Sequence, residues 1–183
     1  MRKVLATSVL LVGLAVILSA GHLQAQDSKD KSKRPSPPAN ATLDLGGGKS
    51  VSIDYSSPRV KGRKVYGDLV PYGKVWRLGA NEATTLVTTA DLNIGGATVP
   101  AGTYTLFAIP DKDKWTLIIS KKTGEWGTQY PGPSEDLARI DMKVSQLPSP
   151  VENFTISFDK SGTGGTLNAD WETTRASVPV AKK

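Results

Sequence analysis

The sequence predicts an all-β domain: a β-sandwich or jelly-roll-like fold of about eight to ten short, mainly antiparallel strands. Short runs in which apolar and polar residues alternate recur from Ala41 to the end of the chain. Clusters of glycine, proline and aspartate separate these runs, and helical periodicity is nearly absent. Two packed sheets are favoured, with a closed barrel as second choice, because a single sheet leaves one apolar face uncovered.

The first half of the domain is expected to contain two glycine-turned hairpins. Residues 42–45 and 49–55 flank three consecutive glycines, and in the second run Val51, Ile53 and Tyr55 alternate with polar residues. Residues 84–89 lead to a second pair, 91–94 and 97–99, around Gly95 and Gly96.

The same signals, alternating apolar residues and turn residues, predict the strands in the centre and at the end of the sheet. Residues 103–109 and 115–120 are the strongest strands, and a proline- and aspartate-containing turn joins them. After a long connection with a possible helical turn near 134–137, alternation predicts the remaining elements, at 138–144, 154–158, 167–171 and 173–180.

The N-terminus is typical of a secretory signal peptide. Arg2 and Lys3 precede an apolar run, Val4 to Leu18, that is shorter than the roughly 20 residues of a spanning helix. We expect a signal peptide at 1–25, a disordered polar and proline-rich linker at 26–40, and a single β-sandwich domain at 41–183. The protein is therefore expected to be exported, periplasmic or secreted, and held at a membrane only if the leader is uncleaved.

Composition excludes many reaction types. The chain has no cysteine, and its single histidine, His22, lies in the expected leader. A Ser-His-Asp triad, a cysteine nucleophile and an ordinary zinc site are therefore excluded, which leaves carboxylate, tyrosine, lysine or serine chemistry. We expect no cofactor and no metal.

The charge balance argues against nucleic acid as a partner. The whole chain carries +6, but from Ala41 onward 17 basic residues face 15 acidic ones. Such a near-neutral domain has no electrostatic footprint for a phosphate backbone.

Three segments carry a family resemblance: GDLVPYGKVWRLGANEATT at 67–85, VPAGTYTLFAIP at 99–110 and WGTQY at 126–130. Together they resemble the uncharacterised bacterial family called domain of unknown function 2911. The resemblance extends from about Ser50 to Trp171 and implies an exported, β-rich protein of unassigned activity.

The segment from Tyr55 to Thr85 is the candidate functional region, because basic, aromatic and amide groups gather there outside any strand pattern. In an extended chain the side chains of Arg59, Lys61 and Arg63 would project from one face and could hold an anion. A planar guanidinium, a stacking surface, an amide and an acceptor suit a small polar or anionic ligand or a sugar. The candidate ligand-binding residues here are Arg59, Arg63, Trp76, Arg77, Asn81 and Glu82.

The alternative for this segment is a structural clasp in which Arg77 pairs with Glu82 beneath an ordered loop. A purely structural envelope protein would then bury these two side chains against each other with no adjoining cavity.

Two further aromatic residues, Trp126 and Tyr130, stand between glycines and prolines and are candidates for a carbohydrate platform. Tyr104 and Trp115 are expected to fill the core instead.

We therefore expect a binding or structural module of the cell envelope that recognises a small polar or anionic ligand, a carbohydrate or an envelope protein. A carboxylate-based, glycosidase-like hydrolase is the alternative, with Glu82 and either Asp68 or Asp54 as the pair.

Overall fold

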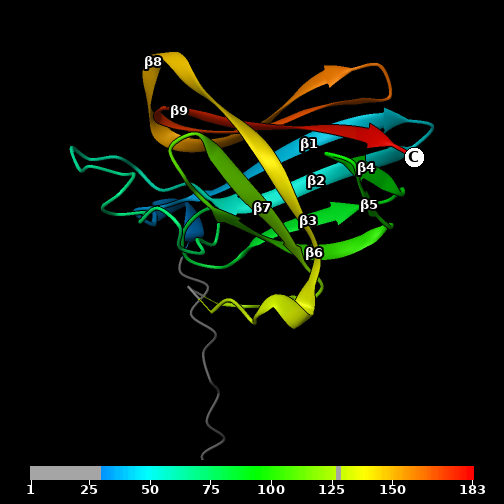
Figure 1. The fold of residues 1–183 in the computed structure, drawn as a ribbon, viewed down its shortest axis with the longest axis horizontal. Helices are drawn as coiled ribbons and strands as arrows, with labels where there is room; N and C mark the ends of the chain where they lie inside the picture. The colour runs from blue at the N-terminus through cyan, green and yellow to red at the C-terminus, as the bar shows by residue number, and fades with distance from the viewer. Residues whose placement is uncertain (1–29, 127–128) are drawn as a thin grey trace, which may run out of the picture.

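The computed structural model describes residues 30–126 and 129–183, so the expected leader and residues 26–29 of the expected linker lie outside the described residues. The described chain is all-β, as the sequence predicts, and holds nine strands and two short 3-10 helices (Figure 1). Neither helix is long or apolar enough to cross a bilayer. The helices are η1 (Lys31–Lys33) and η2 (Pro133–Glu135). The strands are β1 (Pro38–Gly46), β2 (Lys49–Ser56), β3 (Thr84–Thr88), β4 (Leu92–Ile94), β5 (Ala97–Val99), β6 (Gly102–Ile109), β7 (Lys114–Ser120), β8 (Asp136–Ser161) and β9 (Gly164–Lys182).

All nine strands belong to one antiparallel sheet in the order β1-β2-β3-β6-β7-β8-β9-β4-β5. The glycine turns predicted between β1 and β2 and between β4 and β5 are present, and a third turn, at Gly162, joins β8 to β9. Gly95 shows why such a turn needs glycine: its φ is +53°, and an added Cβ would collide with the side chains of Ile140 and Val178.

The two halves of this sheet face each other because β8 and β9 are long and bent. The first part of β8 pairs with β7, whereas its last part pairs only with the start of β9. That far hairpin reaches back to the first strands: Lys160 contacts Asp44 at 3.2 Å, and the Tyr55 hydroxyl accepts the Ile156 N–H at 3.0 Å. Figure 1 shows β7 and β8 crossing in front of β1 to β3, so one folded-over sheet provides both layers of the sandwich.

A single core lies between the layers. The alternating positions Val51 and Ile53 are fully buried, as predicted. Trp115 is also fully buried and Tyr104 is 9% exposed, which confirms both as core residues.

Two segments differ from expectation. β8 is continuous where two separate strands, 138–144 and 154–158, are predicted, because Pro148 and Pro150 fall where the pairing register shifts and needs no ladder hydrogen bond. Residues 30–40, expected to belong to a disordered linker, form η1 and the start of β1. Long-range hydrogen bonds, described below, hold them in place.

Candidate functional site

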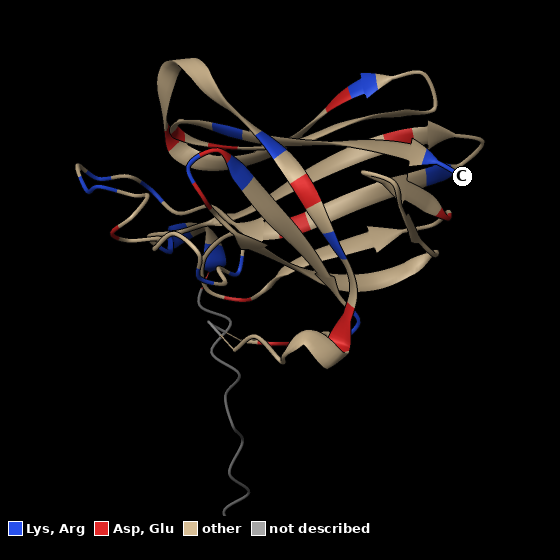
Figure 2. Cartoon of the chain, viewed as in Figure 1, with Lys and Arg blue, Asp and Glu red and all other residues tan. Residues whose placement is uncertain are grey.

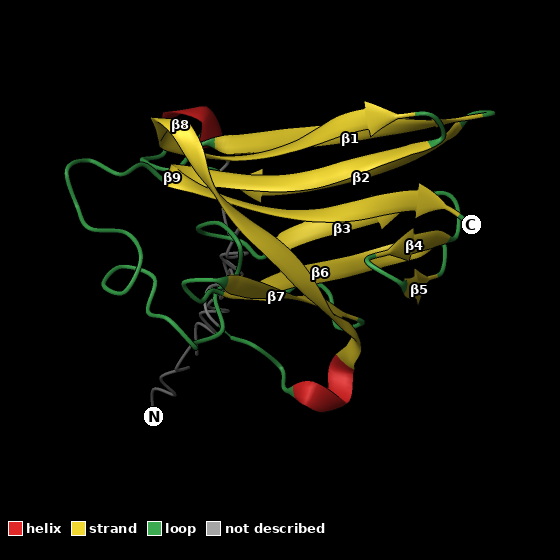
Figure 3. Ribbon diagram, turned by 45° about the horizontal axis from the view of Figure 1, so that its top comes forward, coloured by secondary structure: helices red, strands yellow, loops and turns green. Residues whose placement is uncertain are grey.

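The connection between β2 and β3, residues 57–83, leaves one end of the sheet as a long irregular loop (Figure 3). Its second half is tied to the sheet by backbone hydrogen bonds. Trp76 and Ala108 exchange a pair of them at 2.7 and 2.8 Å, and the Ala80 N–H donates to the Ser56 carbonyl at 3.1 Å. These bonds give the side chains between them fixed positions.

A cavity of about 330 Å³ opens beside this tied segment. We call it the Arg77 cavity. It brings together four of the predicted site residues, Arg63, Trp76, Arg77 and Asn81. The other lining residues are Ser36, Pro58, Leu69, Val70, Gly79, Ala80 and Trp171.

Arg77 is the unusual member of this cavity. Its Nε is buried and has no hydrogen-bond partner, a condition it shares, among the described residues, only with the Tyr66 hydroxyl. No aspartate or glutamate is among the described residues that line the cavity. Burial lowers the pKa of Arg77 from its ordinary value. The cavity therefore presents a guanidinium whose charge no neighbouring carboxylate neutralises.

The aromatic wall of the cavity is apolar. The rings of Trp76 and Trp171 are stacked, with centroids 5.9 Å apart and planes 17° from parallel. Both indole N–H groups are already engaged: Trp76 donates to the Gly79 carbonyl at 3.1 Å and Trp171 to the Glu152 carbonyl at 3.2 Å. Trp171 is buried behind Trp76, so the half-buried Trp76 offers a ligand ring surface, and neither indole offers a free donor.

Glu82 does not pair with Arg77, so the predicted clasp is not formed. Its carboxylate instead accepts two hydrogen bonds from Arg34, at 2.8 and 3.1 Å, and lies 3.1 Å from the Lys31 ammonium. Burial acts to raise the pKa of Glu82, but the hydrogen bonds from Arg34 and Lys31 outweigh it and lower the pKa to about 2.

The cations that hold Glu82 belong to residues 30–37, which we call the N-terminal strap. Two more hydrogen bonds fix it: Asn81 Nδ2 donates to the Ser36 carbonyl at 2.9 Å, and the Ser57 N–H donates to the Pro37 carbonyl at 2.9 Å. Since Ser36 lines the Arg77 cavity, the strap forms part of its wall.

A second hollow of about 280 Å³ adjoins the cavity and shares Ser36 and Arg63 with it. Its other lining residues include Arg59 and Lys61. The three basic residues do gather here, but through a turn with φ of +48° at Lys61 rather than through an extended segment. Figure 2 shows basic positions on this loop and on the neighbouring strap.

Both arginines of this hollow are partly occupied. Arg59 donates to the Ser57 hydroxyl at 2.8 Å, while Arg63 donates from Nε to the Val60 carbonyl at 3.0 Å and from Nη2 to the Arg59 carbonyl. They add positive potential, but much of their hydrogen-bonding capacity shapes the loop.

Trp126 and Tyr130 do not line the Arg77 cavity. Trp126 is 60% exposed, and its backbone pairs with Glu82. The Tyr130 ring packs edge-on against Phe107, and its hydroxyl contacts Asp136 at 2.8 Å. The two residues therefore have separate surroundings.

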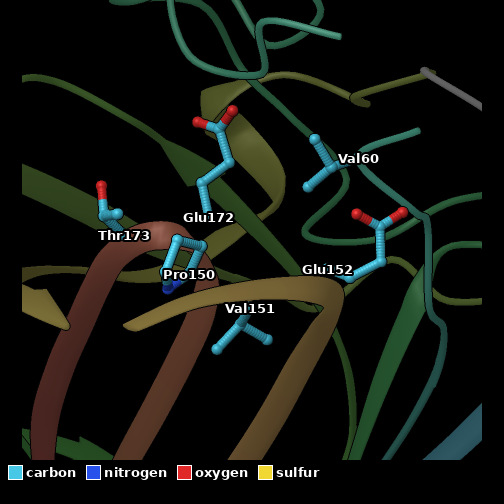
Figure 4. Close-up of a pocket in the computed structure, with 6 residues that line it drawn as sticks. All are labelled: Val60, Pro150, Val151, Glu152, Glu172 and Thr173. Carbon is cyan, nitrogen blue, oxygen red and sulfur yellow. The ribbon is translucent and has the colours of Figure 1, made fainter. Parts of the chain in front are cut away.

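A larger cavity of about 510 Å³ is lined by Val60 of the same loop and by Pro150, Val151, Glu152, Glu172 and Thr173. We call it the acidic cavity. Figure 4 shows its two glutamates reaching from β8 and β9 toward the side on which Val60 lies. Both carboxylates are already used: Glu152 accepts the Lys61 N–H at 2.9 Å and Glu172 the Val65 N–H at 3.4 Å. Within residues 30–126 and 129–183, no three potential metal ligands of the His, Cys, Asp and Glu types cluster.

Sequence reasoning missed several walls of the Arg77 cavity. Leu69 and Val70 belong to the candidate segment but were not singled out, because isolated apolar residues in a loop carry no pattern. Ser36 falls in the expected linker, and Trp171 stands at the end of an expected strand, 167–171. No local signal joins residues 36, 69 and 171, which are distant in sequence.

The model of a family described as "Protein of unknown function (DUF2911)" matches residues 36–180. No curated protein and no solved structure matches the chain. The match confirms the resemblance that the three sequence segments indicate, and it begins within the strap.

Proposed function

The chain belongs to the DUF2911 family, and from this premise, which names no activity, we propose that the protein binds a small anionic ligand in the Arg77 cavity. The observation that carries the proposal is the Arg77 guanidinium, which lines a cavity without a carboxylate and has no hydrogen-bond or ion-pair partner within the described residues; its Nε is buried without an acceptor. A buried donor left unsatisfied costs about 1–3 kcal/mol, and native proteins retain few of them.

An anion would supply what the cavity lacks. The guanidinium of arginine presents a planar fork of N–H groups that matches the oxygens of a carboxylate, sulfate or phosphate. Arg63 adds a second positive charge at the same cavity and Arg59 a third in the adjoining hollow. The volume of about 330 Å³ lies at the lower end of the range for small-molecule sites.

The same features argue for an anion over a neutral sugar. A carbohydrate site needs free donors and acceptors near its aromatic surface, whereas both indole N–H groups here are engaged by backbone carbonyls. The group in the cavity that most lacks a partner is the positively charged Arg77 guanidinium, and an anion compensates such a charge better than a neutral hydroxyl does.

The hydrolase alternative finds little support. A glycosidase needs one carboxyl group with a raised pKa to protonate the leaving group. The pKa of Glu82 is instead lowered to about 2, and Asp54 is exposed and accepts a hydrogen bond from Asn40 at 2.8 Å. We therefore propose binding without turnover.

We further propose that this binding takes place in the cell envelope or outside the cell. The basis is the leader-like sequence at residues 1–25, with its charged start and short apolar run. In that setting the ligand is a free small molecule or an anionic group on an envelope partner.

Isothermal titration calorimetry of the full chain tests the proposal. Acetate, phenylacetate, sulfate and inorganic phosphate are titrated into the wild type and into Arg77→Met, which keeps an unbranched apolar stem and removes the guanidinium. We expect at least one anion to bind the wild type. The variant should bind that anion about 10- to 100-fold more weakly, because it cannot form the charge-assisted hydrogen bond.

The matched control is Lys143→Met, which removes one exposed positive charge from β8, outside the cavity lining. Unchanged binding by this control assigns the loss to Arg77 rather than to net charge. Equal binding by wild type and Arg77→Met, or no binding of any anion, would overturn the proposal.

A further inference from the structure

The composition of the cavity walls restricts which anion fits. Resting on the proposed function, we infer that the ligand of the Arg77 cavity is an organic monocarboxylate with a flat apolar body, rather than a free inorganic anion. The inference comes from the free donors at the charged wall and from the surface of the opposite wall.

The charged wall offers one uncommitted guanidinium. Arg63 already donates from two nitrogens to the backbone carbonyls of Val60 and Arg59. Asn81 donates from Nδ2 to the Ser36 carbonyl. Of these three lining residues, only Arg77 makes no hydrogen bond within the described residues. Its Nε is buried without an acceptor.

This donor supply suits a monoanion. Phosphate and sulfate carry up to two charges on strongly hydrated tetrahedral groups, and sites that strip their water replace it with several N–H donors. A carboxylate needs fewer, because its two coplanar oxygens fit the edge of one guanidinium.

The remaining walls are apolar and partly flat. Trp76 and Trp171 are stacked rings with no free N–H, and the side chains of Pro58, Leu69 and Val70 complete the lining. Pro58, Val70 and Trp171 are buried behind this lining, whereas Trp76 is half-buried and Leu69 is 43% exposed, so these two leave apolar surface at the cavity. An inorganic ion would leave the exposed apolar surface of Trp76 and Leu69 uncovered, whereas a ring or branched chain attached to the carboxylate would bury it.

The experiment compares four probes by calorimetry at one pH and ionic strength: phenylacetate, acetate, inorganic phosphate and the neutral phenylacetamide. We expect phenylacetate to bind at least about tenfold more tightly than acetate, because its ring adds buried apolar area. Phosphate should bind no more tightly than acetate. Phenylacetamide should bind at least about tenfold more weakly than phenylacetate, because it lacks the charge.

A variant at the apolar wall keeps the test independent of Arg77. Leu69→Ser changes an exposed side chain and should leave folding intact, as circular dichroism would verify. It should weaken phenylacetate about three- to tenfold and leave acetate unchanged, because acetate has no body to contact that wall.

The outcomes separate the two proposals. Tight phosphate binding that depends on Arg77, with phenylacetate no better than acetate, overturns the carboxylate inference and leaves the anion site standing. Absence of binding by every anion overturns both. Equal binding of phenylacetate and phenylacetamide also overturns both, because the site would then recognise the ring alone.

Discussion

The Arg77 cavity and the acidic cavity both take lining residues from the loop between β2 and β3, and they differ in how their charges are satisfied. The acidic cavity is larger, about 510 against 330 Å³, and two carboxylates line it. Those carboxylates accept backbone N–H groups from Lys61 and Val65, so they hold the loop in place. The guanidinium of Arg77 has no such partner.

This contrast shows that cavity size alone does not identify a binding site. A charged group that serves the fold has its partners within the fold, whereas a group that serves a ligand is left incomplete. The loop between β2 and β3 shows both cases, since Glu152 and Glu172 hold its backbone N–H groups while its own Arg77 is left without a partner.

Trp171 gives the largest expected effect, because it is a buried aromatic residue that lines one cavity and is hydrogen-bonded to a residue of the other. Its ring lines the Arg77 cavity, and its N–H donates to the Glu152 carbonyl beside the acidic cavity. It is 1% exposed, so Trp171→Ala should lower the free energy of unfolding by about 3–5 kcal/mol. Urea unfolding followed by circular dichroism measures this loss. A loss under about 1 kcal/mol would mean that the Trp171 ring is not packed as a buried wall of the Arg77 cavity.

Arg77→Met should act in the opposite direction on the ligand-free protein. The substitution removes a buried donor that has no acceptor and keeps an apolar stem, so we expect the free energy of unfolding to rise by about 1 kcal/mol. Thermal unfolding of both proteins without ligand measures the change.

Glu152→Ala in the acidic cavity is the comparison for this change. It removes the acceptor of the Lys61 N–H and should lower the free energy of unfolding by about 1 kcal/mol. Two changes of the same sign would remove the distinction between a satisfied and an unsatisfied cavity.

The smallest expected effect concerns pH and the N-terminal strap. The folded pKa of Glu82, about 2, lies below its ordinary value of 4.5, so the ionised carboxylate stabilises the fold. That contribution is complete above pH 4.5 and is lost as the pH falls toward 2. Because the Glu82 side chain is 36% exposed, solvent screening limits the contribution to under about 1 kcal/mol.

Thermal unfolding of the wild type and Glu82→Gln between pH 6 and 2.5 measures the contribution of the ionised Glu82 carboxylate to stability. The difference in stability between the two proteins should shrink across that interval. A constant difference would show that Lys31 and Arg34 do not depend on the Glu82 charge for their position.

Much of the fold follows from local patterns. The alternation of Val51 and Ile53, and glycines at the hairpin turns, reflect requirements of neighbouring residues on one strand, and they predict strands and turns correctly. The length of β8 could not be predicted in this way. Pro148 and Pro150 indicate an interruption, and only the register shifts of the paired strand accommodate them.

The site was predictable as a segment but not as a geometry. Clustering of basic and aromatic residues between Tyr55 and Thr85 indicates that side chains there do more than fill a core. The partner of Glu82 could not be found, because Arg34 lies 48 residues away in a stretch whose lysine, serine and proline content is typical of a spacer. Such pairings depend on tertiary contacts that leave no periodic trace.

The strap also bears on where this domain should be considered to begin. The family match starts at residue 36, and a chain trimmed to that boundary would keep β1 whole. It would lose Lys31 and Arg34, however, and leave Glu82 without either cation beside the wall that Ser36 forms. The boundary of the fold and the boundary of the site are therefore different residues, and a shortened protein could be fully folded yet have an altered cavity.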